Sequence, residues 1–180
     1  MTINVDLNAE DYLVHLLYAK SNNKESKKKR INSWLTITGS SFLIAFAFYV
    51  GDNWSLSLYS LLVGIITLFF YPLYQRSYYK DFYSKYIHKN YQYRFGKESI
   101  ITFQPDYIDI KDATFEGKLF ASELKEIAEI STHYFIKFKI GESIIIPKRQ
   151  VNQKTFLSEI LSIFSNPNIV VQNQLGWRWK

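Results

Sequence analysis

The chain has 180 residues, a formal net charge of +6, 47% hydrophobic residues and no cysteine. The absence of cysteine excludes disulfides and thiolate metal sites. Its mean hydropathy of −0.14 is that of a soluble protein, but such an average conceals apolar segments, which appear only when the chain is read in windows.

The first segment, residues 1–30, is predicted to be cytoplasmic. Residues 2–7 alternate between apolar and polar, which is typical of a strand. Asn8 then caps a helix, with Asp11 at the position of a capping-box partner. One face of this helix is apolar, and the sequence leaves open whether it lies on a bilayer or on a soluble domain. We find no apolar core of a secretory signal peptide in residues 1–30.

Residues 31–75 contain a single charged residue, Asp52. Crossing a bilayer takes about 20 mostly apolar residues, so two spans fit, at about 33–50 and 55–74, joined by an outer turn at 51–54. We therefore predict a transmembrane helical hairpin in the lipid bilayer. Both flanks are basic, and Lys and Arg hold the adjoining end of a span in the cytoplasm. This pattern predicts a multi-pass plasma (inner) membrane protein with both termini in the cytoplasm.

Small residues recur at helical spacing in both spans. In lipid, such stripes allow the close approach on which helix packing depends, so we expect the two stripes to face each other. An alternative is that these residues are scattered on lipid-facing surfaces. The candidate packing residues are Thr38, Ser41 and Ala45 in the first span and Ser57, Ser60 and Gly64 in the second.

Residues 76–97 combine tyrosines with basic residues and are predicted to continue the second span as a juxtamembrane helix. One reading is binding of anionic lipid, because each basic residue near the surface contributes about 1 kcal/mol. The candidate contacts are Arg76, Lys80 and Lys85. The other reading is an aromatic belt at the interface, with one face packed on the soluble domain.

The pattern changes to a period of two at residue 98. Residues 98–166 are predicted to form a small antiparallel β-sheet or barrel plugged by one helix, which makes the whole chain an α+β membrane protein. Asn152 is expected to cap that helix, Phe156 to lie on its apolar face and Asn166–Pro167 to end it. The strands are expected at 100–103, 107–111, 114–121, 126–131, 134–140 and 143–146. The tail, residues 167–180, is expected either to anchor at the membrane surface or to fray.

This order of elements resembles the YcxB-like family of small bacterial membrane proteins. The resemblance covers nearly the whole chain. Its most specific part is Ile144–Arg149 followed by the helix bearing Phe156, with further similarity at 8–12, 107–110 and 124–127. It implies a bacterial protein with a pleckstrin-homology-like (PH-like) domain on a membrane hairpin, and no established reaction. Many eukaryotic members of the PH fold bind inositol lipids through basic residues in the first hairpin turn, but here that turn is Gln104–Asp106.

Motifs for chemistry are absent from the sequence. The histidines at positions 15, 88 and 133 lie in different segments without metal-ligand spacing, and no glycine-rich loop precedes a Lys-Ser or Lys-Thr pair. We therefore expect no catalytic, cofactor-binding or metal-binding residues, no cofactor and no enzymatic activity. Lys148 and Arg149, between a strand and the last helix, are the best candidates for binding an anion or lipid. The alternative is that they are solvated charges beside an edge strand.

The positive charge lies in the two segments that flank the hairpin. Residues 98–180 balance ten basic residues against ten acidic ones. A nucleic-acid-binding domain needs a basic face, so nucleic acid is not an expected partner. The leading hypothesis is a membrane-anchored cytoplasmic module that binds a protein, peptide or lipid, in a regulatory or self-protective role. The alternatives are a subunit of an oligomeric pore or transporter, which requires a homo-oligomer, and a membrane enzyme.

Overall fold

Strand β1 (Thr2–Asp6) and helix α1 (Ala9–Asn22) open the computed structural model of the chain, which describes residues 1–112, 116–164 and 169–180. The Asn8 side chain accepts hydrogen bonds from the backbone N–H groups of Glu10 and Asp11. In return, the Asp11 carboxylate accepts one from the backbone N–H of Asn8. This reciprocal pair confirms the predicted capping box and fixes the point at which the extended chain becomes helical.

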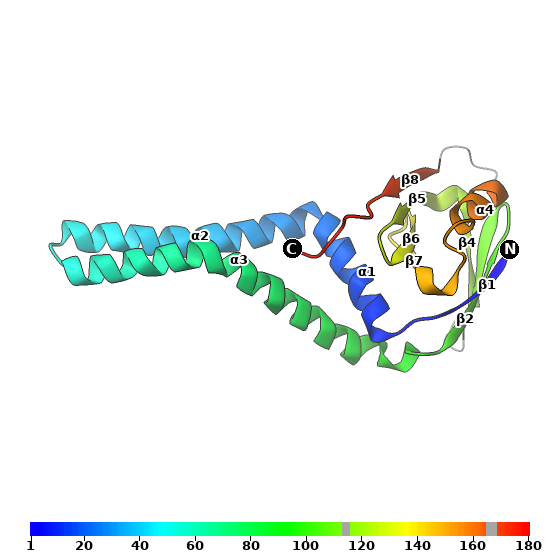
Figure 1. Ribbon diagram of the computed structural model, residues 1–180, viewed down its shortest axis with the longest axis horizontal. Coiled ribbons are helices and arrows are strands. Elements are labelled where there is room, and N and C mark those ends of the chain that lie inside the picture. The colour runs from blue at the N-terminus through cyan, green and yellow to red at the C-terminus, as the bar shows by residue number, and fades with distance from the viewer. Residues whose placement is uncertain (113–115, 165–168) are drawn as a thin grey trace. The chain divides into compact units, whose positions relative to one another are not determined.

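Helices α2 (Lys24–Val50) and α3 (Trp54–Tyr91) form an antiparallel hairpin (Figure 1). Both are long and apolar enough to cross a membrane. The uncharged part of α2, residues 31–50, rises about 30 Å at 1.5 Å per residue, which equals the thickness of a hydrocarbon core. In the turn between the helices Asp52 has a φ of 58°, a left-handed conformation that aspartate adopts more readily than most residues.

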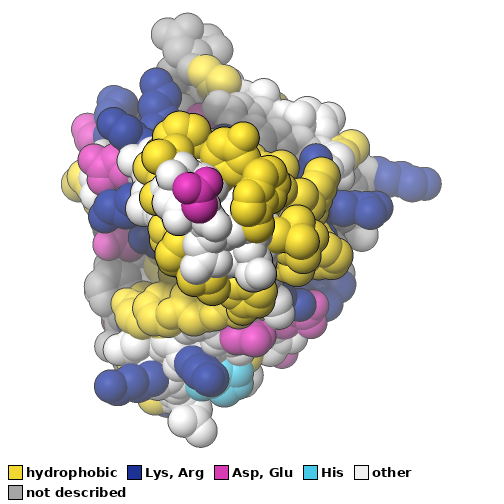
Figure 2. Space-filling view, turned by 90° about the vertical axis from the view of Figure 1, so that its left-hand side faces the viewer, with side chains coloured by type: hydrophobic (Ala, Val, Ile, Leu, Met, Phe, Trp, Pro, Cys, Tyr) yellow, Lys and Arg dark blue, Asp and Glu magenta, His cyan; other side chains and the backbone are white. Residues whose placement is uncertain are grey.

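The outer surface of this hairpin is apolar. Large hydrophobic side chains on both helices are exposed, including Leu43 at 71%, Phe46 at 66% and Phe69 at 66%. Figure 2 looks onto the turn end of the hairpin and shows hydrophobic side chains gathered around it, with an acidic side chain among them. An exposed apolar surface of this extent marks contact with a membrane or a partner.

Polar bonds join the two helices near Pro72. Proline has no N–H to donate to the carbonyl group four residues earlier, which here belongs to Leu68. The indole N–H of Trp34 on α2 donates to that carbonyl over 3.3 Å. The Gln75 amide also donates to the Arg30 carbonyl over 3.1 Å. The α3 helix therefore continues past its proline with a partner for the carbonyl that Pro72 leaves without its usual helical donor.

Among the described residues, β1 and the remaining strands form two four-stranded sheets. Sheet A has the order β1-β2-β3-β4, and all its pairs are antiparallel. Sheet B has the order β7-β6-β5-β8. The strands are β2 (Glu98–Phe103), β3 (Tyr107–Lys111), β4 (Glu116–Phe120), β5 (Leu124–Glu129), β6 (His133–Phe138), β7 (Ser143–Pro147) and β8 (Val170–Asn173). Short 3-10 turns follow α3, β4 and β7, at Gln92–Arg94 (η1), Ala121–Glu123 (η2) and Lys148–Gln150 (η3).

The N-terminal strand belongs to the same unit as the C-terminal sheets. Along its length β1 pairs with β2, from Thr2 opposite Thr102 to Asp6 opposite Glu98. Residues 1–15 and 86–178 form one compact unit, while residues 16–85 and 179–180 form the other. The sequence had predicted separate N-terminal and C-terminal segments. The hairpin is instead an insertion between two parts of one folded unit.

The C-terminal tail is also part of the fold. Strand β8 pairs in parallel with β5, from Val170 opposite Glu126 to Asn173 opposite Glu129. Trp179 is only 8% exposed. The expectation of a frayed tail is therefore wrong for residues 170–173 and 179.

Helix α4 (Phe156–Ile163) packs its apolar face into the core between the sheets. Phe156 and Ile160 are at most 1% exposed, as the amphipathic spacing predicts. The N-cap is Thr155 rather than the expected Asn152, whose backbone and side-chain oxygens accept bonds in the turn before the helix. The expected end at Asn166–Pro167 and the start of the strand expected at 114–121 lie outside the described residues.

Candidate functional site

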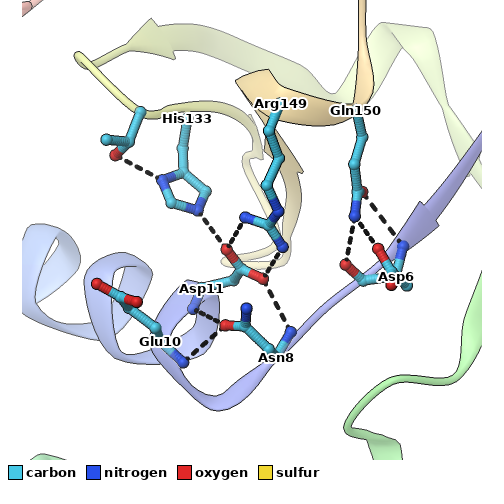
Figure 3. Close-up of polar contacts among 8 residues, drawn as sticks. Asp6, Asn8, Glu10, Asp11, His133, Arg149 and Gln150 are labelled. Atoms are coloured by element: carbon cyan, nitrogen blue, oxygen red, sulfur yellow. Dashed lines mark hydrogen bonds and ion pairs between the residues drawn. The ribbon is translucent and has the colours of Figure 1, made fainter.

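A buried polar cluster holds the start of α1 against η3 and β6 (Figure 3). The two terminal nitrogens of Arg149 donate to the two carboxylate oxygens of Asp11 over 2.6 and 2.7 Å. His133 Nε2 lies 2.9 Å from the same carboxylate. We call Asp11, His133 and Arg149 the Asp11 clasp. It joins residues 122 and 138 positions apart in the chain.

The carboxylate of Asp11 is almost completely buried, with 2% of its side chain exposed. Burial alone raises the pKa of a carboxyl group, but the hydrogen bonds from Arg149, His133 and Asn8 favour the charged form. Their combined effect holds the pKa of Asp11 below its usual range. Asp11 is therefore a charged anchor at neutral pH.

The hydroxyl of Thr132 lies 2.8 Å from His133 Nδ1. A hydroxyl, an imidazole and a carboxylate thus follow one another, as in a nucleophile relay. However, Arg149 occupies both oxygens of the carboxylate, so the charge of Asp11 is already matched by a partner other than the imidazole. The arrangement is satisfied when Thr132 donates to Nδ1 and Nε2 donates to Asp11, which fits a structural clasp.

Beside the clasp, Gln150 holds the end of β1. Its side-chain amide donates to the backbone carbonyl of Asp6 over 2.8 Å and also to the Asp6 carboxylate. Its side-chain oxygen accepts from the backbone N–H of Asp6 over 3.2 Å. Consecutive residues of η3 therefore secure both the end of β1 and the beginning of α1.

Both basic residues predicted as anion contacts in this region have carboxylate partners. Lys148 Nζ lies 2.5 Å from Glu129 and 4.8 Å from the centre of the Tyr134 ring. Arg149 is bound to Asp11. An adjacent cleft of about 340 Å³ is lined by both cations and by Glu10 and Asp11, so an anion entering it would meet carboxylates as well.

A larger cleft of about 700 Å³ opens in the same unit. Its floor is the inner face of sheet A, one wall is the start of β7, and the other wall is the aromatic stretch that ends α3 and forms η1. We call it the β7 cleft. Its apolar lining is Val5, Leu7, Ile101, Ile110, Leu119, Ile144 and Ile145, and its aromatic and polar lining is Tyr12, Tyr86, Asn90, Tyr91, Tyr93, Arg94, Ser99, Asp112, Glu142 and Ser143.

Arg94 is a notable side chain in the β7 cleft. Its Nε is buried and has no hydrogen-bond partner in the part of the chain that the structure describes. Its guanidinium carbon lies 5.6 Å from the centre of the Tyr93 ring. Sequence analysis did not single out Arg94, because one arginine among six basic residues carries no distinguishing local signal.

The three histidines have separate environments. His15 packs against Phe135 with its ring tilted and the ring centres 5.2 Å apart, and His133 belongs to the clasp. Burial, with smaller contributions from Lys137 and His133, lowers the pKa of His15 to about 4. Among the described residues, no group of three or more His, Cys, Asp or Glu could hold a metal ion.

Five of the six predicted packing residues are buried, bonded or closely packed where α2 meets α3. Thr38, Ala45 and Ser60 are at most 9% exposed, and Ser57 donates to the Ala45 carbonyl over 2.9 Å. A Cβ at Gly64 would lie 3.1 Å from the Phe42 ring, so this glycine permits the close approach. Ser41 is half-buried and donates to the Ile37 carbonyl in its own helix.

Exposed basic residues lie at the end of the hairpin opposite its turn. Because Gln75 bonds to Arg30, the basic half of α3 begins level with the basic start of α2. We call these exposed side chains the basic collar: Lys24, Lys27, Lys28, Lys29, Arg76, Lys80 and Lys85. In the same unit, Trp179 donates to the Arg76 carbonyl over 3.0 Å, and the Arg30 guanidinium lies 4.6 Å from its ring centre.

Comparison with protein-family models, curated proteins and solved structures gives no match to this chain. The fold itself is α+β, with two long apolar helices inserted into a unit of two sheets and a helix.

Proposed function

We propose that this chain is a non-enzymatic integral membrane protein whose hairpin anchors a cytoplasmic PH-like module, and that this module binds a protein, peptide or lipid partner. The domain would act at the inner surface of the plasma membrane of a bacterium, in a regulatory or self-protective role. This proposal includes membership of the YcxB-like family.

The observation that carries the proposal is the insertion of the hairpin into a folded unit. Residues 1–15 and 86–178 fold together, and β1 hydrogen-bonds to β2. A bilayer cannot separate paired strands, so both ends of the hairpin have to emerge on the same side. Two crossings satisfy this requirement, and a single crossing does not.

The charges favour the cytoplasm as that side. The basic collar lies at one end of the hairpin, and the turn at the other end carries only Asp52. Lys and Arg near the ends of spans are retained on the cytoplasmic side. Attraction to anionic lipid headgroups would add about 1 kcal/mol for each basic residue near the surface.

The two sheets and α4 support the PH-like assignment. Strands β1–β4 form one sheet and β5–β7 belong to the next, and α4 follows β7 and contributes to their shared core. Strand β8 is an addition to this plan. Strand β1 precedes the hairpin in the chain, whereas the other strands of sheet A follow it. A module of this kind offers sheet edges and clefts for binding.

The pore alternative is less well supported. It requires the small polar stripe of the spans to face water in an oligomer. In this chain, Thr38 and Ser60 of that stripe are buried at the α2–α3 contact, and Ser57 is bonded across it. Lining a path with these residues would require the two helices to separate.

Labelling of single cysteines tests the anchoring and its orientation, because the natural chain contains no cysteine. Asn53→Cys lies in the turn, while Lys28→Cys and Lys89→Cys lie on the two flanks. A membrane-impermeant maleimide should label Asn53→Cys in intact protoplasts and should label the two flank variants only in inverted vesicles. Labelling of all three from one side, or extraction of the protein by alkaline carbonate, would refute the spanning hairpin.

A further inference from the structure

Strand β7 leaves one edge of sheet B unpaired along the β7 cleft. Among the described residues, sheet B ends at β7 on this side, whereas β8 covers the opposite edge beside β5. Ser143, Ile144 and Ile145 all line the cleft. An uncovered edge strand is a template on which another extended chain can pair.

The register identifies which backbone groups face outward. Phe138 donates to the Glu142 carbonyl, and Lys148 donates to the Thr132 carbonyl. Hydrogen-bonded pairs alternate along an antiparallel ladder, so Ile144 and Ile146 bond to β6, while Ser143 and Ile145 present N–H and C=O on the open side. Pro147 falls at the next outward position, where it has no N–H to offer, so the accessible edge spans Ser143 to Ile145.

From this edge, the apolar floor and the charges, we propose that the β7 cleft binds an extended peptide that adds a strand to β7. The peptide would carry apolar residues at alternate positions, an acidic residue for Arg94 and a basic residue for Glu142. This inference deepens the proposed function, on which it rests, by naming the class of partner and its site.

The open edge favours a peptide over an acyl chain. A strand satisfies the N–H and C=O groups of Ser143 and Ile145, whereas an acyl chain would bury them without partners. Burying such a group without a hydrogen-bond partner is costly. Alternate side chains of an added strand would rest on the half-buried apolar residues that line the cleft, Leu7, Ile110 and Leu119.

The charges at the cleft also favour a peptide over an acyl chain. Arg94 has no carboxylate within 4.0 Å among the described residues, and its Nε lacks a hydrogen-bond partner there. Asp112 and the exposed Glu142 also line the cleft. A fatty acid anion would meet both carboxylates, whereas a peptide with charges of both signs can match the two walls.

The test uses the full chain in lipid nanodiscs and a phage-displayed library of random twelve-residue peptides. We expect selected peptides with alternating apolar residues and an acidic residue. Ser143→Pro removes one outward N–H at a position where an edge strand accepts proline, and should weaken binding of these peptides at least about tenfold. The matched control Ser143→Ala removes only the hydroxyl group and should change the Kd by less than about twofold.

Arg94→Gln provides a second variant that leaves β7 unaltered, and it decides the test if Ser143→Pro lowers the thermal unfolding midpoint. Arg94→Gln should weaken the binding of acidic peptides about threefold to tenfold. It should leave the binding of the same peptides with Gln in place of Glu unchanged. Recovery of no peptide, or binding insensitive to both variants, would overturn the proposal. So would displacement of a fluorescent fatty acid by oleate with no effect of Ser143→Pro, since the cleft would then hold an acyl chain. Cysteine labelling reads the membrane orientation independently of these results.

Discussion

The carboxylate of Asp11 has two side-chain partners that differ in exposure. Only 5% of the His133 side chain is exposed, but 49% of the Arg149 side chain is. Removing Arg149 leaves a charge buried inside the protein, whereas removing the charge of Asp11 leaves an arginine that can turn into water. Removing one member of a buried pair is costly mainly when the remaining charge stays buried.

We therefore predict that Arg149→Gln destabilises the fold more than Asp11→Asn does. The expected loss is about 3 kcal/mol for Arg149→Gln and about 1–2 kcal/mol for Asp11→Asn. The measurement is thermal or denaturant unfolding of the full chain in nanodiscs, with Lys125→Gln on the exposed surface as a control. Equal losses for the two variants would contradict this account of the clasp.

The lowered pKa of His15 leads to a prediction of how the stability of the fold depends on pH. Its pKa falls from 6.5 to about 4 in the folded chain, so the unfolded chain binds the proton more tightly. The contribution of His15 to the free energy of unfolding is fully present above about pH 6.5. It is lost as the pH falls towards 4, by on the order of 2–3 kcal/mol. Asp11, whose folded pKa is depressed, acts in a lower window: its contribution is lost as the pH falls below about 4.

His15→Phe should flatten the stability profile between pH 6.5 and 4, because it keeps an aromatic ring beside Phe135 without a titratable group. The measurement is the unfolding midpoint at half-unit pH intervals. The substitution His88→Phe, at an exposed position on α3, controls for the loss of a histidine. A profile of unchanged slope in the His15 variant would show that this residue does not cause the pH dependence.

At the scale of the helix, Pro72 leaves the carbonyl of Leu68 without its helical N–H donor, and a side chain of α2 supplies another donor. The carbonyl of Leu68 receives the indole N–H of Trp34. We predict that Trp34→Phe destabilises the hairpin and that Pro72→Ala reduces this loss, because alanine restores an N–H for Leu68. A double-mutant cycle in nanodiscs should give a coupling of about 0.6–1.7 kcal/mol, the range for hydrogen bonds between membrane helices. Additive effects would mean that this bond contributes no energy.

The elements that the sequence predicted correctly depend on local patterns. The long uncharged segments, the alternation in β2 and β3, the apolar run in β7 and the reciprocal cap of Asn8 and Asp11 are all local features of the sequence. Strand β8 was missed because Val170–Asn173 is short and only partly buried, so it has no clear alternation. The Asp11 clasp was missed because its partners lie more than 120 positions apart, and no local pattern links them.

At the scale of the whole molecule, the unit of residues 1–15 and 86–178 depends on β1, a strand that precedes the hairpin in the chain. Val5 in β1 is 1% exposed and belongs to the core, and β1 forms one edge of sheet A. Without β1, the core would lose buried apolar surface and β2 would become an edge strand. Folding of this unit therefore requires the hairpin to return the chain to its starting side.

The prediction that follows compares two soluble versions of the chain. In the first, a long Gly-Ser linker replaces residues 16–85; in the second, the chain consists of residues 86–178 alone. The first should unfold cooperatively in urea, because it retains β1 and the Asp11 clasp, while the second should lack a cooperative transition. Adding Val5→Asp to the first version should abolish its transition, since a charge would enter the core. The control Asn4→Lys also adds a charge to β1, but on its exposed side and next to the Glu98 carboxylate, and should preserve the transition. If residues 86–178 fold equally well without β1, the hairpin would be an appendage to a self-sufficient domain, and strand pairing would no longer constrain the sides on which its ends emerge.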